Sequence, residues 1–319
     1  MVSGDASFRR YVRFEHEGVS YIGVDAPPDK EDSQPFVDVS HAYAEHGLDV
    51  PKVIHEDMTL GFMCLSDLGD DLLLPALNDD TVDDYYAKAL AMLTMVGKAT
   101  HTNAGQLPLY DEALLHDEMD LFTDWFLPKH LQIEPSGQEQ QMMVETFAVL
   151  VDNALTQTQV GVHRDYHSRN LMIKANNELA TFDYQDAVIG GITYDVVSLL
   201  RDCYITWPDE LVYRHLLAFK QTMTKDYPEL EQVSDQTFKR WFDLMGLQRH
   251  IKVCGVFSRL CYRDGKEGYL DDIPRTLDYL IAVGSKYPEF SDFMTFLTEK
   301  VRPALLAKEL NKVQCKEQS

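Results

Sequence analysis

The chain has 319 residues, of which 45% are hydrophobic and 11% aromatic, enough for one large domain or two lobes with a substantial core. Its 29 lysine and arginine residues stand against 52 aspartate and glutamate residues, so the net charge is −23. A chain this acidic repels nucleic acids and anionic membrane surfaces, which excludes both as expected partners. Any site for a phosphorylated ligand must therefore depend on local cations and backbone N–H groups.

The cysteines indicate the cellular compartment of the protein. There are five of them, an odd number, and no C-x-x-C pair occurs, which predicts reduced thiols in a cytoplasmic protein. No apolar run has transmembrane length, and the N-terminus has no signal-peptide core. Cys254 and Cys261 lie on one face of an expected helix, which favours core packing over a metal site.

The N-terminal part of the chain is expected to be rich in β-structure. Aromatic and β-branched residues flank the turn at Glu17-Gly18, which predicts a hairpin. The expected strands are 7–14, 19–24, 53–55 and 60–65, and the expected helix is 35–45. The polar turn 66–71 is the expected boundary between a β-rich nucleotide-binding lobe, residues 1–68, and a helical lobe, residues 69–319, with the catalytic loop and the acceptor site.

Most of the remaining chain has the periodicity of helices. Between Val82 and Val96, apolar residues recur at steps of three and four, with Asp80 or Thr81 as the expected N-cap. The expected helices are 81–100, 114–126, 138–155, 194–205, 209–225, 235–262, 274–285 and 289–310.

The most specific pattern is the segment from His163 to Asn170, which reads H-R-D-x-x-x-x-N. Short apolar runs precede and follow it, and a third run, 179–182, ends at Asp183. Strands around a loop would direct Asp165, Asn170 and Asp183 into one cleft. Phosphoryl transfer from ATP needs a carboxylate that orients the acceptor hydroxyl, and an amide and a carboxylate that hold magnesium. An isolated H-x-D could be a capped turn or a core histidine, but the longer match favours the kinase interpretation.

The order of the elements predicts the fold class. A small β-rich lobe with one helix, a short linker and a helical lobe with a β-hairpin active loop together indicate a kinase. The expected class is α+β, with a bilobal protein-kinase-like fold. Element order and motif position agree, which strengthens the prediction.

The catalytic segment resembles that of the aminoglycoside phosphotransferase-like (choline kinase-type) family. His167 stands where protein kinases have a lysine, and Asp183 with Asp186 replaces their D-F-G. Within the family, several segments resemble bacterial kinases that phosphorylate the anomeric hydroxyl of N-acetylmuramate and N-acetylglucosamine. These segments are DASFRRY (5–11), DAPP (25–28), EMDLF (118–122), WF (125–126) and QRHIKV (248–253). The resemblance covers nearly the whole chain, and it implies a first helix ahead of residue 1.

The resemblance implies an activity and a role for each matched residue. The product would be the sugar 1-phosphate, in cell-wall sugar recycling, with ATP and Mg²⁺ as cofactors. Asp165 would be the base or would orient the acceptor, and Asn170 and Asp183 would be magnesium ligands. The residues implied as structural support are His163 beneath the loop, Asp186 beside the metal or substrate, and Asp195 on the backbone of the catalytic loop. Asp195 could instead be a plain N-cap of its own helix.

One departure from the kinase pattern concerns the phosphates. Kinases place a lysine on the third strand of the small lobe, and the segment 19–25 has none. Arg9 and Arg10 on the first hairpin, or Lys30, could supply that charge. The hairpin should cover the nucleotide, which favours Arg9 or Arg10, although either could be a solvent-facing strand residue. Ser7 and backbone N–H groups of the first loop are the other expected contacts.

The acceptor site has weaker signals. The candidates for binding the sugar are Glu118, Asp120, Arg249 and His250. A carboxylate can accept hydrogen bonds from sugar hydroxyls, and Arg249 could meet the lactyl carboxylate of N-acetylmuramate. Each of the four could instead belong to a structural salt bridge or a solvated helix face.

Two alternatives to a sugar kinase remain open. A related kinase of aminoglycosides, choline or homoserine fits the same catalytic segment, and the acidity of the chain suits a cationic aminoglycoside. A nucleotide-binding pseudokinase is suggested by the missing lysine. The presence of Asp165, Asn170 and Asp183 argues against the pseudokinase.

Overall fold

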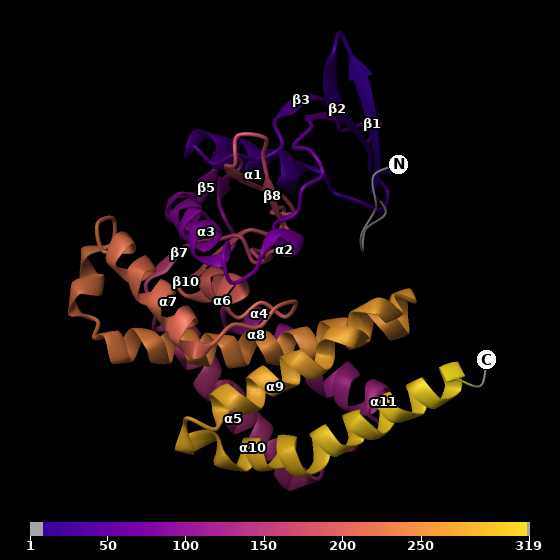
Figure 1. Cartoon of the computed structure of the whole chain (residues 1–319), viewed down its shortest axis with the longest axis vertical. Helices are drawn as coiled ribbons and strands as arrows, with labels where there is room; N and C mark the ends of the chain where they lie inside the picture. The colour runs from indigo at the N-terminus through magenta and orange to yellow at the C-terminus, as the bar shows by residue number, and fades with distance from the viewer. Residues whose placement is uncertain (1–8, 318–319) are drawn as a thin grey trace. The chain divides into compact units, whose positions relative to one another are not determined.

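The computed structural model describes residues 9–317, with side chains described through residue 310. The chain forms two compact units (Figure 1). The first contains the residues up to Leu109, Thr158–Asp202 and Trp207–Val233, and the second contains Tyr110–Gln157, Cys203–Thr206 and the residues from Ser234 onward. The N-terminal sheet and the H-R-D segment therefore belong to one unit. The lobe boundary expected after residue 68 stays a prediction.

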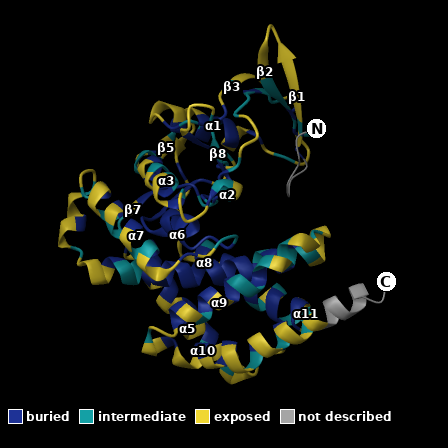
Figure 2. Cartoon of the chain, viewed as in Figure 1, coloured by how far each residue is buried: buried dark blue, intermediate teal, exposed yellow. Residues whose placement is uncertain are grey.

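The N-terminal sheet has four antiparallel strands in the order β1-β2-β4-β3. They are β1 (Arg10–His16), β2 (Val19–Asp25), β3 (Val53–Asp57) and β4 (Phe62–Ser66), as predicted apart from their ends. The hairpin turns at Glu17 and Gly18, which both have positive φ and so match the twist of the strands. Figure 2 shows that β1 is mostly exposed. Residues 7 and 8 of the first predicted strand lie outside the described residues.

Helix α1 (Gln34–Glu45) confirms the predicted helix, and it buries Phe36, Val39 and Tyr43. Further along the first unit, short strands frame the H-R-D segment. Strand β7 (Gln159–Val162) pairs with β10 (Val188–Gly191), and β8 (Leu171–Ile173) pairs with β9 (Leu179–Thr181). The other elements of this unit are α2 (Leu73–Ala76), α3 (Val82–Lys98), β5 (His101–Thr102), β6 (Gly105–Gln106), α6 (Tyr194–Leu200), α7 (Asp209–Met223) and the 3₁₀ segment η2 (Pro228–Gln232).

A glycine on β7 lets the strand approach α3 closely. A Cβ atom at Gly161 would lie 2.3 Å from the Val96 carbonyl oxygen and 2.6 Å from that of Ala99. Backbone packs on backbone here, which fixes β7 and the loop that follows it against the end of α3.

The second unit is helical. Its elements are α4 (Glu112–Leu121), η1 (Phe122–His130), α5 (Gly137–Leu155), α8 (Asp235–Asp264), η3 (Glu267–Asp272), α9 (Ile273–Gly284), η4 (Pro288–Phe290), α10 (Ser291–Phe296), η5 (Leu297–Val301) and α11 (Arg302–Glu317). Helix α8 packs against α4, η1, α5 and α9, so it is buried over most of its length (Figure 2). At Gly255 a Cβ would lie 2.4 Å from the Leu121 carbonyl carbon, so the two backbones are in contact.

Several predicted helices differ in detail. The helix expected over 114–126 begins at Glu112 and continues as the π-helical segment η1, which contains Pro128. Proline has no N–H to donate, and a wider turn accommodates it. The helix expected over 289–310 is divided by the π-helical segment η5. The helix expected to end at residue 205 ends at Leu200. Thr81 precedes α3 without capping it, because its hydroxyl donates to the Ala76 carbonyl at 2.7 Å.

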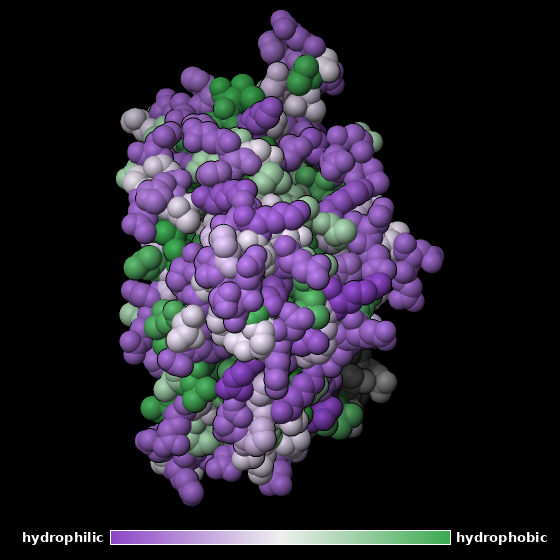
Figure 3. Space-filling view, turned by 90° about the vertical axis from the view of Figure 1, so that its left-hand side faces the viewer, coloured by the Kyte–Doolittle hydropathy of each residue, from purple (hydrophilic) through white to green (hydrophobic). Residues whose placement is uncertain are grey.

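The surface is consistent with the composition. The face drawn in Figure 3 is mainly hydrophilic, with hydrophobic residues in small groups. Within the described residues, no helix combines the length and the apolar character needed to cross a membrane.

Candidate active site

The H-R-D segment forms the loop between β7 and β8, and it brings three predicted residues together. The Asn170 side-chain amide donates to the Asp165 carbonyl oxygen at 3.0 Å and to Asp183 Oδ2 at 3.3 Å. A backbone hydrogen bond also joins these two segments: Phe182 N–H donates to the Asn170 carbonyl oxygen at 3.2 Å. The amide and both acidic residues therefore belong to one small cluster.

Asp183 follows β9 in a left-handed conformation, with φ of 65°. Non-glycine residues rarely adopt this region, and those that do are concentrated at functional sites. The residue is exposed overall, yet enclosure of its carboxylate raises its pKa and the negative charge of Asp165 raises the pKa further. A hydrogen bond from Gln185 Nε2 to Asp183 Oδ1, at 3.1 Å, acts in the opposite direction and lowers the pKa of Asp183. A cation bound here would relieve the repulsion between the two carboxylates.

The loop is held from beneath by the carboxylate of Asp195 on α6. Asp195 Oδ2 accepts from His163 N–H at 2.7 Å, and Oδ1 accepts from Arg164 N–H at 3.1 Å. Arg164 also has positive φ, 74°, so these bonds stabilise a strained backbone. The N-cap of α6 is Thr193; the alternative that Asp195 only caps its own helix is therefore wrong.

His163 is fully buried at the base of the loop. Its Nε2 lies 2.8 Å from Thr181 Oγ1, and its ring meets Tyr166 and Tyr184 edge-on at centroid distances of 5.5 and 6.1 Å. Burial lowers the pKa of His163 to about 4, so the imidazole is neutral near pH 7. These contacts suit a structural role for His163 in supporting the loop, and not a role in proton transfer.

Two more aspartates contact the loop, one through its carboxylate and one through its backbone carbonyl. Asp202, after α6, accepts from Ser168 N–H at 2.9 Å and from the Ser168 hydroxyl. No motif marks Asp202 in the sequence; its position seven residues after Asp195, just beyond the end of the same helix, is the one available signal. Asp186 is exposed, and its carbonyl accepts from Arg164 Nη1 at 3.3 Å.

The predicted phosphate-binding residues differ in their exposure and in their ion-pair partners. Ser7 lies outside the described residues. Arg10 is exposed and forms an ion pair with Asp25, whereas Arg9 is 7% exposed and lies beside Glu31. Lys30 is exposed. Of the two predicted arginines, Arg9 is therefore the one enclosed by the fold.

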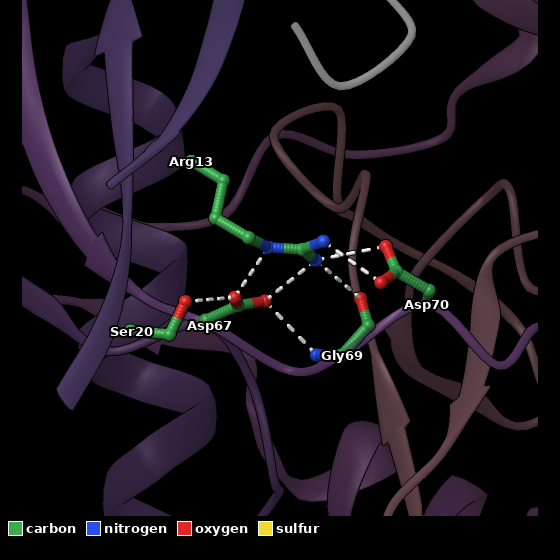
Figure 4. A network of polar contacts seen from close by, with 5 residues as sticks. All are labelled: Arg13, Ser20, Asp67, Gly69 and Asp70. Carbon is green, nitrogen blue, oxygen red and sulfur yellow. Dashed lines mark hydrogen bonds and ion pairs between the residues drawn. The ribbon is translucent and has the colours of Figure 1, made fainter. Parts of the chain in front are cut away.

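A network around Arg13, in the middle of β1, ties the hairpin to the segment after β4 (Figure 4). Arg13 donates from Nε to Asp67 at 2.6 Å, from Nη1 to Asp70 at 2.7 Å, and from Nη2 to the Gly69 carbonyl at 3.1 Å. Ser20 on β2 also donates to Asp67, at 2.6 Å. No motif marks Arg13 in the sequence. The alternation of β1, which puts Tyr11 and Arg13 on one face, is the signal that could have found it.

The predicted acceptor-binding residues all belong to the second unit. Glu118 on α4 is 6% exposed, and its Oε1 lies 2.8 Å from Lys252 Nζ. Tyr110 donates its hydroxyl to Glu118 and accepts from Gln248 Nε2 at 3.1 Å. The charge of Glu118 is thus balanced within the unit by a buried lysine.

The other three candidates differ in exposure. Asp120 is exposed near the end of α4. Partial burial of its carboxyl group by neighbouring residues raises the pKa of that group. Arg249 and His250 are buried on α8, and the His250 ring stacks on Tyr279 with centroids 5.1 Å apart. Their role in acceptor binding stays a prediction.

The donor set suits a magnesium ion that arrives with a nucleotide. Over the described part of the chain, no group of three or more His, Cys, Asp or Glu residues has the geometry to hold a metal. Magnesium in kinases takes one or two protein ligands and completes its shell with phosphate oxygens and water. One amide and one carboxylate, Asn170 and Asp183, meet that requirement.

A left-handed aspartate beside an H-R-D loop, with a buried carboxylate beneath that loop, defines a phosphotransferase of the kinase type. The chain matches the phosphotransferase enzyme family over residues 2–233, and it belongs to that family. It is 41% identical over 290 residues to the N-acetylmuramate/N-acetylglucosamine kinase of Pseudomonas aeruginosa, which covers 91% of this chain and 85% of that protein. It is 38% identical over 304 residues to the kinase of the same name from Neisseria meningitidis, covering 94% and 89%. The predicted family and the predicted kind of enzyme are confirmed.

Solved structures confirm the predicted α+β, protein-kinase-like fold. An ethanolamine kinase from Plasmodium vivax has a TM-score of 0.59 at 9% identity, covering 85% of this chain and 81% of that one. The choline kinase LicA from Streptococcus pneumoniae has a TM-score of 0.57 at 13% identity, covering 88% and 92%. At these identities the likeness concerns the fold alone.

Proposed function

We propose that this protein transfers the γ-phosphoryl group of ATP to the anomeric hydroxyl of N-acetylmuramate and N-acetylglucosamine, giving the sugar 1-phosphates. The observation that carries the proposal is the similarity of nearly the whole chain to kinases named for these two sugars, at 37–41% identity. The clustering of Asn170 with Asp165 and Asp183 supports a phosphoryl-transfer site in this chain.

In the proposed reaction, the anomeric oxygen forms a bond to the γ-phosphorus while the bond from that phosphorus to the β–γ bridging oxygen breaks. ADP leaves, and the hydroxyl proton passes to Asp165. An anomeric hydroxyl is more acidic than an ordinary alcohol, so positioning by Asp165 contributes more than its basicity. Magnesium, when bound, neutralises charge on the phosphates. Asn170 and Asp183 would hold it, and Asp195 would keep Asp165 in place through the loop backbone.

For the acceptor, we propose that Asp120 accepts hydrogen bonds from sugar hydroxyls and that Arg249 meets the lactyl carboxylate of N-acetylmuramate. Glu118 and His250 are the remaining candidates. Glu118 already has Lys252 and Tyr110 as partners, so it would act by shaping this part of the second unit.

The test is an acceptor panel with Mg·ATP, followed by ³¹P and ¹H NMR of the product. The panel contains N-acetylmuramate, N-acetylglucosamine, their 1-O-methyl glycosides, an aminoglycoside, choline and homoserine. We expect turnover of the two free sugars only, with phosphorus coupled to the anomeric proton. Turnover of a 1-O-methyl glycoside would exclude the anomeric position. Preferred turnover of choline, homoserine or the aminoglycoside would replace the proposal with the corresponding kinase.

A further inference from the structure

A buried arginine, Arg9, directly precedes β1 in the first unit and packs against α1. The side chain of Arg9 is 7% exposed. Its guanidinium carbon lies 5.9 Å from the ring centroid of Phe36 on α1, and its Nη2 donates to the Asp32 carbonyl at 3.4 Å.

One chain of contacts leads from Arg9 to Asp183. Arg9 lies over the Phe36 ring, and that ring stacks on Tyr184, the residue after Asp183, with centroids 5.1 Å apart and planes at 13°. Arg9 therefore packs beside the segment that carries Asp183.

A carboxylate contacts Arg9 from the segment between β2 and α1. Glu31 Oε2 lies 3.6 Å from Arg9 Nε, and its side chain is 16% exposed. In kinases, a strand lysine and a helix glutamate form an ion pair that sets the lysine against the ATP phosphates. Strand β2, Val19–Asp25, has no lysine at any position.

We infer that Glu31 is a positioning residue that holds Arg9 against the ATP phosphates, so that the Arg9–Glu31 pair replaces the lysine–glutamate pair of kinases. The inference rests on the proposed kinase function and deepens it. The planar fork of arginine meets two phosphate oxygens at once, and arginine stays charged in enclosed surroundings where lysine readily loses its proton. The face of Phe36 favours the cation and fixes its plane.

The test compares ligands with and without phosphates. Isothermal titration calorimetry measures the Kd of Mg·ATP and of adenosine for wild type, Arg9→Met, Arg9→Lys, Glu31→Gln and Glu31→Asp. Glu45→Gln is the matched control, because Glu45 is an exposed carboxylate at the end of α1. Steady-state assays with N-acetylglucosamine give KM for ATP and for the sugar, and thermal melts report folding.

We expect Arg9→Met to weaken Mg·ATP binding by about 10–100-fold, as loss of a charge-assisted hydrogen bond does. Glu31→Gln should weaken it by about 3–10-fold, because the cation remains but is less well held. Glu31→Asp and Arg9→Lys should restore part of each loss. Adenosine affinity and the sugar KM should stay at wild-type values in all variants, and Glu45→Gln should match wild type throughout.

Wild-type Mg·ATP affinity in both Arg9→Met and Glu31→Gln would overturn the inference, and so would equal losses for Mg·ATP and adenosine. If Arg9→Met fails to fold, Arg9→Lys and Glu31→Gln decide by the same criterion. Sugar turnover by wild type with unresponsive variants removes this inference and leaves the proposed function standing. If the Arg9 and Glu31 variants bind Mg·ATP more weakly but wild type turns over no sugar, the acceptor proposal is wrong and this inference stands.

Discussion

The two compact units each contain a carboxylate cluster, and the clusters differ in how their charge is balanced. In the second unit, Glu118 is buried against Lys252 and the Tyr110 hydroxyl. In the first unit, burial raises the pKa of Asp183, and the negative charge of the nearby Asp165 raises it further. A balanced pair stabilises its surroundings as it stands, whereas a like-charged pair gains from an added cation. The balanced cluster therefore suits packing, and the like-charged cluster suits binding of a charged ligand.

The largest expected effect is on catalysis by the like-charged cluster. Asp165→Asn should lower kcat by about 10²–10⁴-fold, because the carboxylate that orients the acceptor hydroxyl and takes its proton is lost. Mg·ATP affinity should change little. Stopped-flow and steady-state assays with N-acetylglucosamine measure both. Asp79→Asn, the same change at an exposed position of the first unit, is the control. Retention of most activity by Asp165→Asn would show that this cluster is not the reacting centre.

The balanced cluster is tested by its stability. Glu118→Gln should lower the free energy of unfolding by about 3 kcal/mol, because it leaves the buried Lys252 without its carboxylate. The double variant Glu118→Gln/Lys252→Met should recover much of the loss. Urea denaturation measures both, with Glu145→Gln, exposed on α5, as control. If Glu118→Gln leaves the stability unchanged and raises the KM for the sugar, the contrast between the two clusters is wrong and Glu118 is a sugar ligand.

Acid should destabilise the loop of the first unit through His163. The pKa of His163 is about 4 in the folded protein, below its unfolded value of about 6.5. The unfolded state therefore binds more protons between these values, and stability falls as the pH drops from 6.5 to 4. The loss reaches roughly 3 kcal/mol at most. Denaturation at several pH values should show this slope in wild type and His16→Asn, an exposed histidine, and a flatter slope in His163→Asn. Equal slopes in all three proteins contradict the assignment.

The smallest expected effect is the repulsion at Asp183 itself. Without magnesium, Asp183→Asn should raise the free energy of unfolding by less than about 1 kcal/mol, since solvent around this exposed residue screens the repulsion between the two carboxylates. Added Mg·ATP should then raise the melting temperature of wild type but not of the variant. Thermal melts with and without Mg·ATP measure both effects. If Asp183→Asn is stabilised by Mg·ATP as strongly as wild type, Asp183 is not a magnesium ligand.

The sequence was most informative where local pattern determines structure. Strand alternation around Glu17-Gly18 and helical periodicity after Val82 predicted the hairpin and α3. The spacing of Asp165, Asn170 and Asp183 predicted a cluster that the structure contains. In these cases each residue is positioned by neighbours within a few turns or by one short loop.

Features that depend on distant partners could not be predicted in this way. Strand β10 has only Val188 and Ile189 as an apolar signal, and it forms because β7 lies beside it. The pairing of Glu118 with Lys252 joins residues of two helices far apart in sequence. Glu31 has no pattern around it, and its contact with Arg9 depends on how the segment after β2 turns back.

The attachment of the β1–β2 hairpin has a consequence for how the molecule opens. Arg13 meets Asp67 and Asp70 near the surface, and the Asp70 side chain is 71% exposed. Dissolved ions screen such pairs, with a Debye length of about 8 Å at physiological ionic strength and about 3 Å at 1 M. Rising salt should therefore speed amide hydrogen exchange in the edge strand β1, while β2, which is paired with β4, and the buried α8 keep their protection. Strand β1 is thus expected to open locally, at a free-energy cost set in part by the surrounding electrolyte.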